Sequence, residues 1–127
     1  MAKYVDGFVL VVPKNKFSEY KKMAQMGAKV WMKYGALDYK ECVGEDLKTK
    51  EMGGTKPLAF TQMAKAKPNE TVWFSFVVFK SRKHRDEVNA KVMKHMEKEM
   101  TKEKGKPMPF DMNRVAYGGF EVIVDAK

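Results

Sequence analysis

The stretch that decides the fold is YVDGFVLVV, residues 4–12, because it is apolar on both faces when it is read as a β-strand. Side chains alternate along a strand, so the valines at positions 5, 9 and 11 point one way and the apolar residues at 4, 8, 10 and 12 point the other way. A second stretch, TVWFSFVVF at residues 71–79, has the same pattern. Two helices can cover only one face of such a sheet. The other face is therefore expected to meet a second subunit or to enclose a ligand cavity.

Length and composition bound the class of protein. A chain of 127 residues with 44% hydrophobic residues is expected to form one domain over residues 1–127. The formal net charge is +9, with 25 Lys and Arg against 16 Asp and Glu. Nearly all of the excess is lysine scattered along the chain, which is typical of a solvated surface. Specific nucleic-acid binding is therefore not expected, although a basic surface attracts polyanions without specificity.

The single cysteine, Cys42, allows no intrachain disulfide and no cysteine metal cluster, which is typical of a reducing compartment. The longest apolar run, residues 7–12, is too short to span a bilayer. Asp6 interrupts the region where a signal peptide would have its apolar core. We therefore expect a cytoplasmic protein without a membrane segment.

Two helices are predicted from apolar residues spaced three and four positions apart. The first runs from residue 16 to residue 34, with Asn15 as its N-cap and Gly35 after its last turn. The second begins after Ser81, a good N-cap, and continues to about Met100. Residues 57–63 are expected to form one short helical turn, because proline is tolerated at the first helical position.

Two further strands complete the pattern. Residues 37–43 carry Asp38 and Lys40 on one side, which indicates a strand near a sheet edge. Residues 114–124 form the last strand, and its Gly118-Gly119 pair predicts a bulge or a close backbone approach. Residues 45–57 and 101–113 are predicted to be exposed loops.

The order strand, helix, strand, strand, helix, strand predicts an α+β fold of the ferredoxin-like βαββαβ type with a four-stranded antiparallel sheet. In that topology the first and third strands are central, and these are the two strands that are apolar on both faces. The helices cover one face. The other face is best covered by the same face of an identical subunit, which gives a homodimer in the form of a dimeric α+β barrel.

Several strings of sequence point to one family. They are YVDGFV at residues 4–9, GAL at 35–37 followed by Glu41-Cys42, Arg85-Asp86 followed by Asn89 and Lys91, MPFD at 108–111 and YGGFE at 117–121. Together they resemble the bacterial YbaA-like proteins, a family classed as domain of unknown function 1428, nearly from end to end. The resemblance implies a dimeric α+β barrel and brings no family-level catalytic residues. That fold is shared by small monooxygenases of aromatic substrates, by haem-dependent relatives and by proteins without known activity.

The candidate catalytic residues are carboxylates and phenols. Asp6 lies on a strand that we expect to be central, so its carboxylate is either paired, hydrogen-bonded or lining a wet cavity or, as we favour, solvated near the strand end. Glu41 shares a strand face with Tyr39, and Glu121 shares one with Tyr117. A carboxylate beside a phenol can bind and deprotonate an aromatic or carbonyl compound. Salt bridges with lysines at the rim are the simpler explanation of both glutamates.

The candidate ligand-binding residues are Trp31, Trp73, Ser75, His84 and Arg85. At the start of the second helix, His84 and Arg85 can hold an anion. The two tryptophans are more typical of a core or an interface than of a cofactor site, and a surface position explains the histidine.

Arg85 and Asn89 lie four positions apart on the second helix, so they share a face and are expected to clamp the C-terminal loop through Asp111. His84 and His95 are too far apart on that helix to share a metal, and no zinc or iron spacing is present. We therefore expect neither a metal nor a cofactor.

The leading functional hypothesis is a homodimer that binds or oxidises a small planar or aromatic metabolite in a cavity between the two sheets. An oxygenase of this kind would use no metal or flavin, with electrons supplied by the substrate. The alternative is a non-catalytic binding or interaction protein that associates with RNA through its lysines. Salt separates the two, because polyanion binding falls steeply with ionic strength. The sequence leaves open whether the protein is an enzyme.

Overall fold

The computed structural model describes residues 2–102 and 107–126. Its elements follow in the order β1 (Tyr4–Pro13), η1 (Lys14–Lys16), α1 (Phe17–Lys33), β2 (Asp38–Val43), α2 (Phe60–Met63), β3 (Glu70–Phe79), α3 (Arg82–Lys102), η2 (Met112–Arg114) and β4 (Ala116–Glu121). The predicted βαββαβ order is confirmed. The short helical turn predicted before the third strand is also confirmed, as α2.

The four strands form one antiparallel sheet in the order β2-β3-β1-β4. This ferredoxin-like α+β arrangement is the predicted one, with β1 and β3 in the centre and β2 at an edge. In the register, Leu10 of β1 lies opposite Trp73 of β3, and Phe8 lies between Ser75 on one side and Tyr117 on the other. Two residues paired in the register have their side chains on the same face of the sheet. The alternation along each strand therefore assigns each side chain to one face or to the other.

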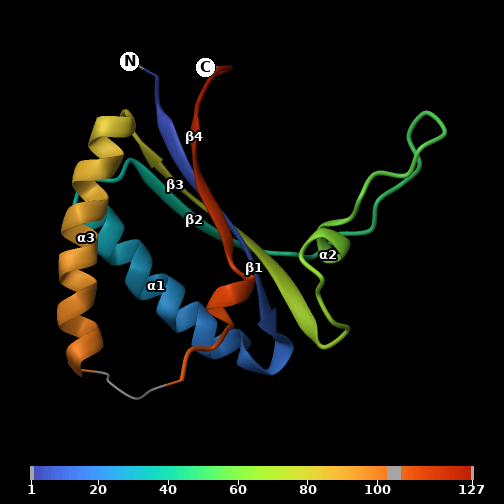
Figure 1. Cartoon of the computed structure of the whole chain (residues 1–127), viewed down its shortest axis with the longest axis horizontal. Coiled ribbons are helices and arrows are strands. Elements are labelled where there is room, and N and C mark those ends of the chain that lie inside the picture. Colours follow the sequence, from blue (N-terminus) through green and yellow to red (C-terminus); the bar gives the residue numbers. More distant parts are fainter. Residues whose placement is uncertain (1, 103–106, 127) are drawn as a thin grey trace.

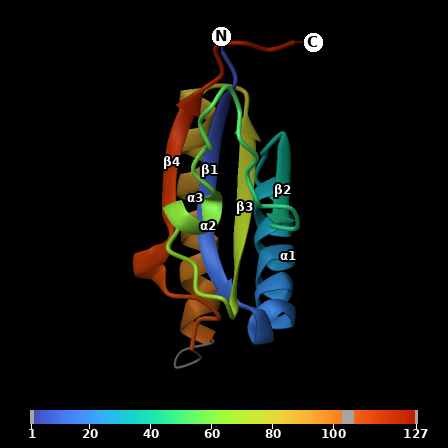
Figure 2. The same ribbon diagram turned by 90° about the vertical axis from the view of Figure 1, so that its right-hand side faces the viewer.

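Helices α1 and α3 cover the same face of the sheet (Figures 1 and 2). The core on this face has two parts. Beneath the first half of α1, the buried residues are Leu10, Val12, Tyr20, Ala24 and Trp73. Beneath α3, they are Ala36, Val77, Phe79, Val88 and Val92.

The predicted helix ends are confirmed at two of three positions. The Oγ of Ser81 accepts a hydrogen bond from the backbone amide of His84 at 3.1 Å, so Ser81 caps α3. Gly35 follows α1 with a φ of +112°, which favours glycine. The expected cap at Asn15 is wrong. Because the chain enters the 3₁₀ turn η1 directly after β1, Asn15 lies inside that turn and α1 starts from Lys16 without a side-chain cap.

The last strand is shorter than predicted. Residues 112–114 form the turn η2, in which the Asp111 carboxylate accepts from the amide of Asn113 at 2.9 Å, and β4 begins only at Ala116. The register between β1 and β4 runs without interruption through Gly118 and Gly119, so no bulge occurs in this pairing. The alternative, a close approach to the backbone, is found at Gly119, where a Cβ would lie 2.7 Å from Nη2 of Arg85. Of the predicted loop 101–113, residues 101 and 102 continue α3, and residues 103–106 lie outside the described ranges.

The face of the sheet opposite α1 and α3, which we call the open face, is also apolar. Phe74 of β3 is 44% exposed there, and Phe120 of β4 is 61% exposed. Among the described residues, α2 and its flanking segments cross this face (Figure 2). The prediction that the central strands are apolar on both sides is therefore confirmed, and the helices cover one side. The open face carries Val5, Val9, Phe74, Phe76, Val78 and Phe120.

Residues 45–57, which we call the arm, project away from the sheet on the side opposite α1 and α3 (Figure 1). At the tip, Met52 and Thr55 exchange two backbone hydrogen bonds of 2.7 and 3.1 Å around Gly53 and Gly54, whose φ angles are +58° and +83°. Two successive positive φ angles are typical of a tight hairpin turn. Nearer the base, the Oγ1 of Thr49 donates to the carbonyl of Pro57 at 2.7 Å. The predicted exposed loop is thus a two-limbed hairpin.

Candidate functional site

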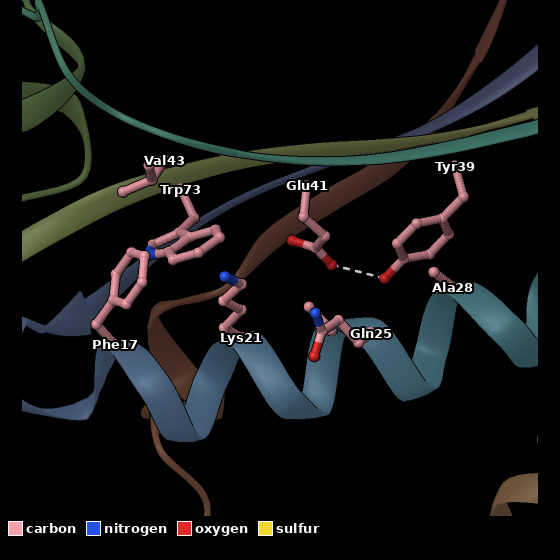
Figure 3. A pocket seen from close by; sticks show the side chains of 9 residues that line it. Phe17, Lys21, Gln25, Ala28, Tyr39, Glu41, Val43 and Trp73 are labelled. Atoms are coloured by element: carbon pink, nitrogen blue, oxygen red, sulfur yellow. Dashed lines mark hydrogen bonds between the residues drawn. The ribbon is translucent and has the colours of Figure 1, made fainter.

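Glu41 is held between two tyrosines on the helix-covered face of the sheet. Alternation along β2 places Tyr39 and Glu41 on that side, and α1 brings Tyr20 to the same point. The Tyr20 hydroxyl donates to Oε1 of Glu41 at 2.9 Å. The Tyr39 hydroxyl donates to Oε2 at 2.6 Å, and Figure 3 shows this bond as a dashed line. Each carboxylate oxygen thus accepts one phenol hydrogen bond. The predicted pairing of a carboxylate with a phenol on β2 exists, and a second phenol joins it.

The two phenols are protonated donors at neutral pH. Burial raises the pKa of Tyr20 above its ordinary value, and the adjacent charge of Glu41 and the hydrogen bond to it raise the pKa further. Burial likewise raises the pKa of Tyr39, with the same carboxylate as the second cause. Both hydroxyls therefore act as hydrogen-bond donors to the Glu41 carboxylate.

Beside this cluster, a groove of about 330 Å³ lies between α1 and the strands β2 and β3 (Figure 3). Its volume is at the lower end of the range of small-molecule sites, about 300 to 1,000 Å³. One end is aromatic, because the rings of Phe17 and Trp73 lie 5.5 Å apart there. Glu41 contributes an acceptor to the wall. The lining residues are Phe17, Lys21, Ala24, Gln25, Ala28, Tyr39, Glu41, Val43 and Trp73.

Trp73 brings an unpaired donor to this wall. Its side chain is 4% exposed, and the indole Nε1 is buried without a hydrogen-bond partner among the described residues. A buried indole N–H usually has a partner, because its desolvation otherwise costs about 1 to 3 kcal/mol. The groove wall therefore combines aromatic rings with a carboxylate acceptor, and one of these rings belongs to an indole whose N–H is buried without a partner.

A second polar cluster lies beneath α3 around Asp6. This carboxylate is 5% exposed and accepts a hydrogen bond of 3.0 Å from the side-chain amide of Asn89. The oxygen of that amide accepts from the indole of Trp31 at 3.0 Å, and Nε of Arg85 lies 3.6 Å from Asp6. The favoured expectation of a solvated Asp6 is wrong, because Asp6 lies opposite Val77 on the face of the sheet that α3 covers, where Asn89 and Arg85 reach it. The paired alternative is the correct one.

Arg85 completes this cluster. Its Nη2 donates to the hydroxyl of Tyr4 at 3.1 Å, and its guanidinium lies 4.8 Å from the centre of the Tyr4 ring. The expected clamp of Arg85 and Asn89 on Asp111 is wrong. The face of α3 that carries these two residues packs down onto β1, whereas Asp111 caps η2.

The other predicted site residues lie apart from the groove. Tyr117 is 77% exposed and stacks on Phe8, and Glu121 is exposed further along β4. In the sheet order, β3 and β1 separate both residues from Glu41 on β2. Of the ten predicted site residues, the structure brings Tyr39, Glu41 and Trp73 together in the groove wall.

The remaining candidates, Trp31, Ser75 and His84, make packing contacts or hydrogen bonds within the fold and do not line the groove. Trp31 packs against Tyr39, with 5.8 Å between ring centres, but its indole serves the Asp6 cluster. Ser75 is buried opposite Glu41 in the register. The Nδ1 of His84 accepts from the amide of Lys80 at 3.0 Å, and the His84 ring packs on Phe79.

Sequence reasoning missed the side of the groove that α1 supplies. Helical periodicity places Phe17 and Tyr20 on the apolar stripe of α1 and Lys21 on its polar side, and it gives no sign that the three residues line one groove. One signal was available at Tyr20, because a phenol within a buried stripe needs a partner for its hydroxyl. An acidic residue with the right strand parity, such as Glu41, is the partner to look for.

Within residues 2–102 and 107–126, no three His, Cys, Asp or Glu side chains gather in a way that would hold a metal ion. No helix in the same ranges combines the length and the apolar character needed to cross a membrane.

The fold and the helix-side groove define a small ferredoxin-like α+β protein. More narrowly, the chain belongs to the family described as "Protein of unknown function (DUF1428)", whose sequence profile matches residues 3–112. The resemblance noted from the sequence strings is thereby confirmed.

Relatives and a solved structure agree with this assignment. The chain is 41% identical over 123 residues to "Uncharacterized protein YbaA" of Escherichia coli K12, which covers 97% of this chain and 98% of the relative. A protein of the same description from Shigella flexneri matches with the same values. A solved structure described as a dimeric ferredoxin-like protein, from an uncultured marine organism, aligns with a TM-score of 0.50 at 10% identity. That alignment covers 99% of this chain and 100% of the other, and it supports the fold.

Proposed function

We propose that this protein is a homodimer in which each subunit binds a small planar molecule in the groove beside Glu41. The observation that carries the proposal is the carboxylate held by two protonated phenols in the wall of an aromatic-lined groove. The expected cavity between two sheets is less suitable for such a ligand, since Tyr39 and Glu41 face α1. Each face of the sheet thus has its own role: the open face for assembly and the helix side for the ligand.

The open face supports the dimer. Each square ångström of apolar surface removed from water contributes about 25 cal/mol, and Phe74 and Phe120 are the most exposed aromatic residues of this face. A two-fold axis would place the same apolar patch of each copy against the other, so every exposed ring gains a partner. The solved structure that this chain resembles is itself described as dimeric.

Sedimentation equilibrium at micromolar concentration tests the dimer. We expect twice the chain mass of 14.6 kDa for the wild type and a monomer for Phe74→Asp. Phe74 is already 44% exposed in the single chain, so the aspartate leaves the monomer folded, but the charge would be buried unpaired in the dimer. Met26→Asp is the matched control, because Met26 is 52% exposed on α1. A wild-type monomer, or a dimeric Phe74→Asp, would contradict the proposed interface.

The chemistry of the groove selects a ligand class. Because both phenol protons point at Glu41, the remaining lone pairs of the carboxylate are acceptors for a ligand N–H or O–H group. The rings of Phe17 and Trp73 favour a planar apolar body. The raised pKa values of Tyr20 and Tyr39 leave neither residue as a phenolate base at neutral pH. The proposal is therefore one of binding.

Titration with benzamidine, a planar cation, and with its neutral analogue benzamide tests the groove by nuclear magnetic resonance. The ¹⁵N indole signal of Trp73 is expected to shift with benzamidine, and the signal of Trp31 is expected to stay in place. Glu41→Gln should remove the preference for the cation, while Glu121→Gln, an exposed carboxylate on β4, should not. Equal shifts of both indoles, or no effect of Glu41→Gln, would refute the assignment.

A titration with RNA at two salt concentrations distinguishes RNA binding from binding in the groove. Binding of polyuridine through surface lysines should fall steeply between 50 and about 200 mM salt, because counterions are released. Binding in the groove involves one carboxylate and should change little over that range. A salt-sensitive RNA complex together with a silent Trp73 signal would favour the non-catalytic interaction protein.

A further inference from the structure

We infer that in the dimer the arm of each subunit lies along the partner subunit and clasps it. This inference rests on the proposed dimer and specifies which segment, beyond the sheet itself, meets the second copy. The starting observation is the direction of the arm, which leaves the body on the side of the open face (Figure 1). A second copy docked on the open face would therefore lie beside the arm.

The reach of the arm exceeds the gap that it has to cross. Its outgoing limb, residues 45–52, spans up to roughly 25 Å if extended at about 3.3 Å per residue. Two sheets packed face to face lie about 10 Å apart, and α2 between them would add about 10 Å more. An arm that starts at the open face and points away from it therefore passes the level of the partner's sheet and continues along its side.

The arm and its base carry four exposed apolar side chains. Met52 at the tip is 71% exposed, and Leu58, directly after the arm, is 67% exposed. In α2, Phe60 and Met63 are 45% and 51% exposed. Met52 thus lies at the tip of the arm, and the other three side chains lie at its base, where α2 crosses the open face (Figure 2). Exposed apolar groups that adjoin the proposed interface favour a protein contact.

The charge of the arm favours a second copy over a polyanion. The chain as a whole has a net charge of +9, but the arm has three acidic residues and three lysines, which sum to zero. A segment that grips nucleic acid concentrates positive charge. The balanced residues of the arm are Glu45, Asp46, Lys48, Lys50, Glu51 and Lys56.

The arm is also ordered before it meets a partner. The Met52–Thr55 turn fixes its tip, and the Thr49 to Pro57 hydrogen bond joins its limbs. A preformed hairpin loses little conformational entropy on docking. Most of the free energy gained by burying its apolar side chains therefore stabilises the dimer.

Photo-crosslinking tests the clasp directly. The photoreactive residue p-benzoylphenylalanine replaces Met52 in one variant and Met26 in the matched control, since both methionines are exposed and Met26 lies on α1. We expect irradiation to convert the Met52 variant to a covalent dimer and to leave the Met26 variant at the mass of one chain. The sedimentation mass of each variant is measured before irradiation.

The outcomes separate this inference from the proposed dimer. A sample that sediments as a dimer but gives no covalent dimer from position 52 overturns the clasp alone. A wild-type chain that sediments as a monomer overturns the dimer and the clasp together. As a second measurement, Met52→Ser with Leu58→Ser should raise the dimer dissociation constant on the order of tenfold or more. The control pair Met26→Ser with Met93→Ser should leave that constant unchanged, and an equal effect of both pairs would overturn the clasp.

Discussion

Replacing Gly119 by alanine tests whether the Tyr4–Arg85 contact stabilises the fold. A Cβ at position 119 would lie 2.6 Å from Cε2 of Tyr4 and 2.7 Å from Nη2 of Arg85. An ordinary contact requires about 3.5 to 4 Å, so the Tyr4 ring has to move by on the order of 1 Å. The neighbouring Gly118 provides a matched control, because the nearest atom to its Cβ, in the Phe120 ring, is 3.8 Å away.

The magnitude follows from what the displaced ring loses. Overpacking costs about 1 to 3 kcal/mol, and moving Tyr4 to relieve it weakens the hydrogen bond from Arg85, a bond to a charged group worth about 1.5 to 3 kcal/mol. The two costs do not add, because the movement of the Tyr4 ring that relieves the overpacking is also what weakens the hydrogen bond. Both alanines lower the conformational entropy of the unfolded chain, which stabilises the fold by about 0.4 to 1 kcal/mol in each variant and cancels in the comparison. We therefore expect Gly119→Ala to be about 2 kcal/mol less stable than Gly118→Ala.

Urea unfolding followed by far-ultraviolet circular dichroism measures this difference. The protein concentration has to be the same for both variants, because association shifts apparent stability. If the two free energies of unfolding agree within about 0.5 kcal/mol, the close approach of β4 to Tyr4 does not stabilise the fold and the reasoning fails.

Three further predictions concern single contacts. The hydrogen bonds from Arg114 lower the pKa of Glu70 from 4.5 to about 2. Their contribution to the free energy of unfolding is therefore complete above pH 4.5 and is lost as the pH falls towards 2. The stability gap between wild type and Glu70→Gln, measured by urea unfolding, should close over that window, and a constant gap would contradict this. Tyr39→Phe removes the 2.6 Å bond to Glu41 and should cost about 1.5 kcal/mol by the same assay, whereas an unchanged unfolding midpoint would refute the contribution. Ser81→Ala removes the cap of α3 and should cost about 1 kcal/mol; a midpoint equal to wild type would show the cap to be dispensable.

The arrangement of the sheet was predictable because two strands carry apolar residues at odd-numbered and at even-numbered positions, that is, on both faces. Such strands are stable only in the centre of a covered sheet, and β1 and β3 occupy that place. The polar positions of β2 likewise indicated an edge. The alternation rule also assigned Tyr39 and Glu41 to one face correctly, because it depends only on the geometry of one strand.

The groove was not predictable in full, because it depends on which helix residue meets which strand residue. Periodicity places Tyr20 on the buried side of α1 but does not say that it stands over Glu41. Asp6 shows the same limit. Its partners, Asn89 and Arg85, come from an element more than 75 positions away, and only the packing of α3 on β1 brings them together.

The two proposed roles of the protein meet in β2. Its odd-numbered residues, Tyr39 to Val43, form a wall of the groove, and the residue after the strand, Gly44, leads into the arm. The amide of Gly44 donates to the carbonyl of Val72 at 2.8 Å, and a Cβ at Gly44 would lie 2.9 Å from the same oxygen. The base of the arm is therefore fixed to β3 at a site where glycine leaves the required space. Because the proposed ligand site and the proposed dimer interface lie on opposite faces of the same strands, Phe74→Asp is expected to change assembly without touching the groove wall. Glu41→Gln is expected to change the groove without touching the open face.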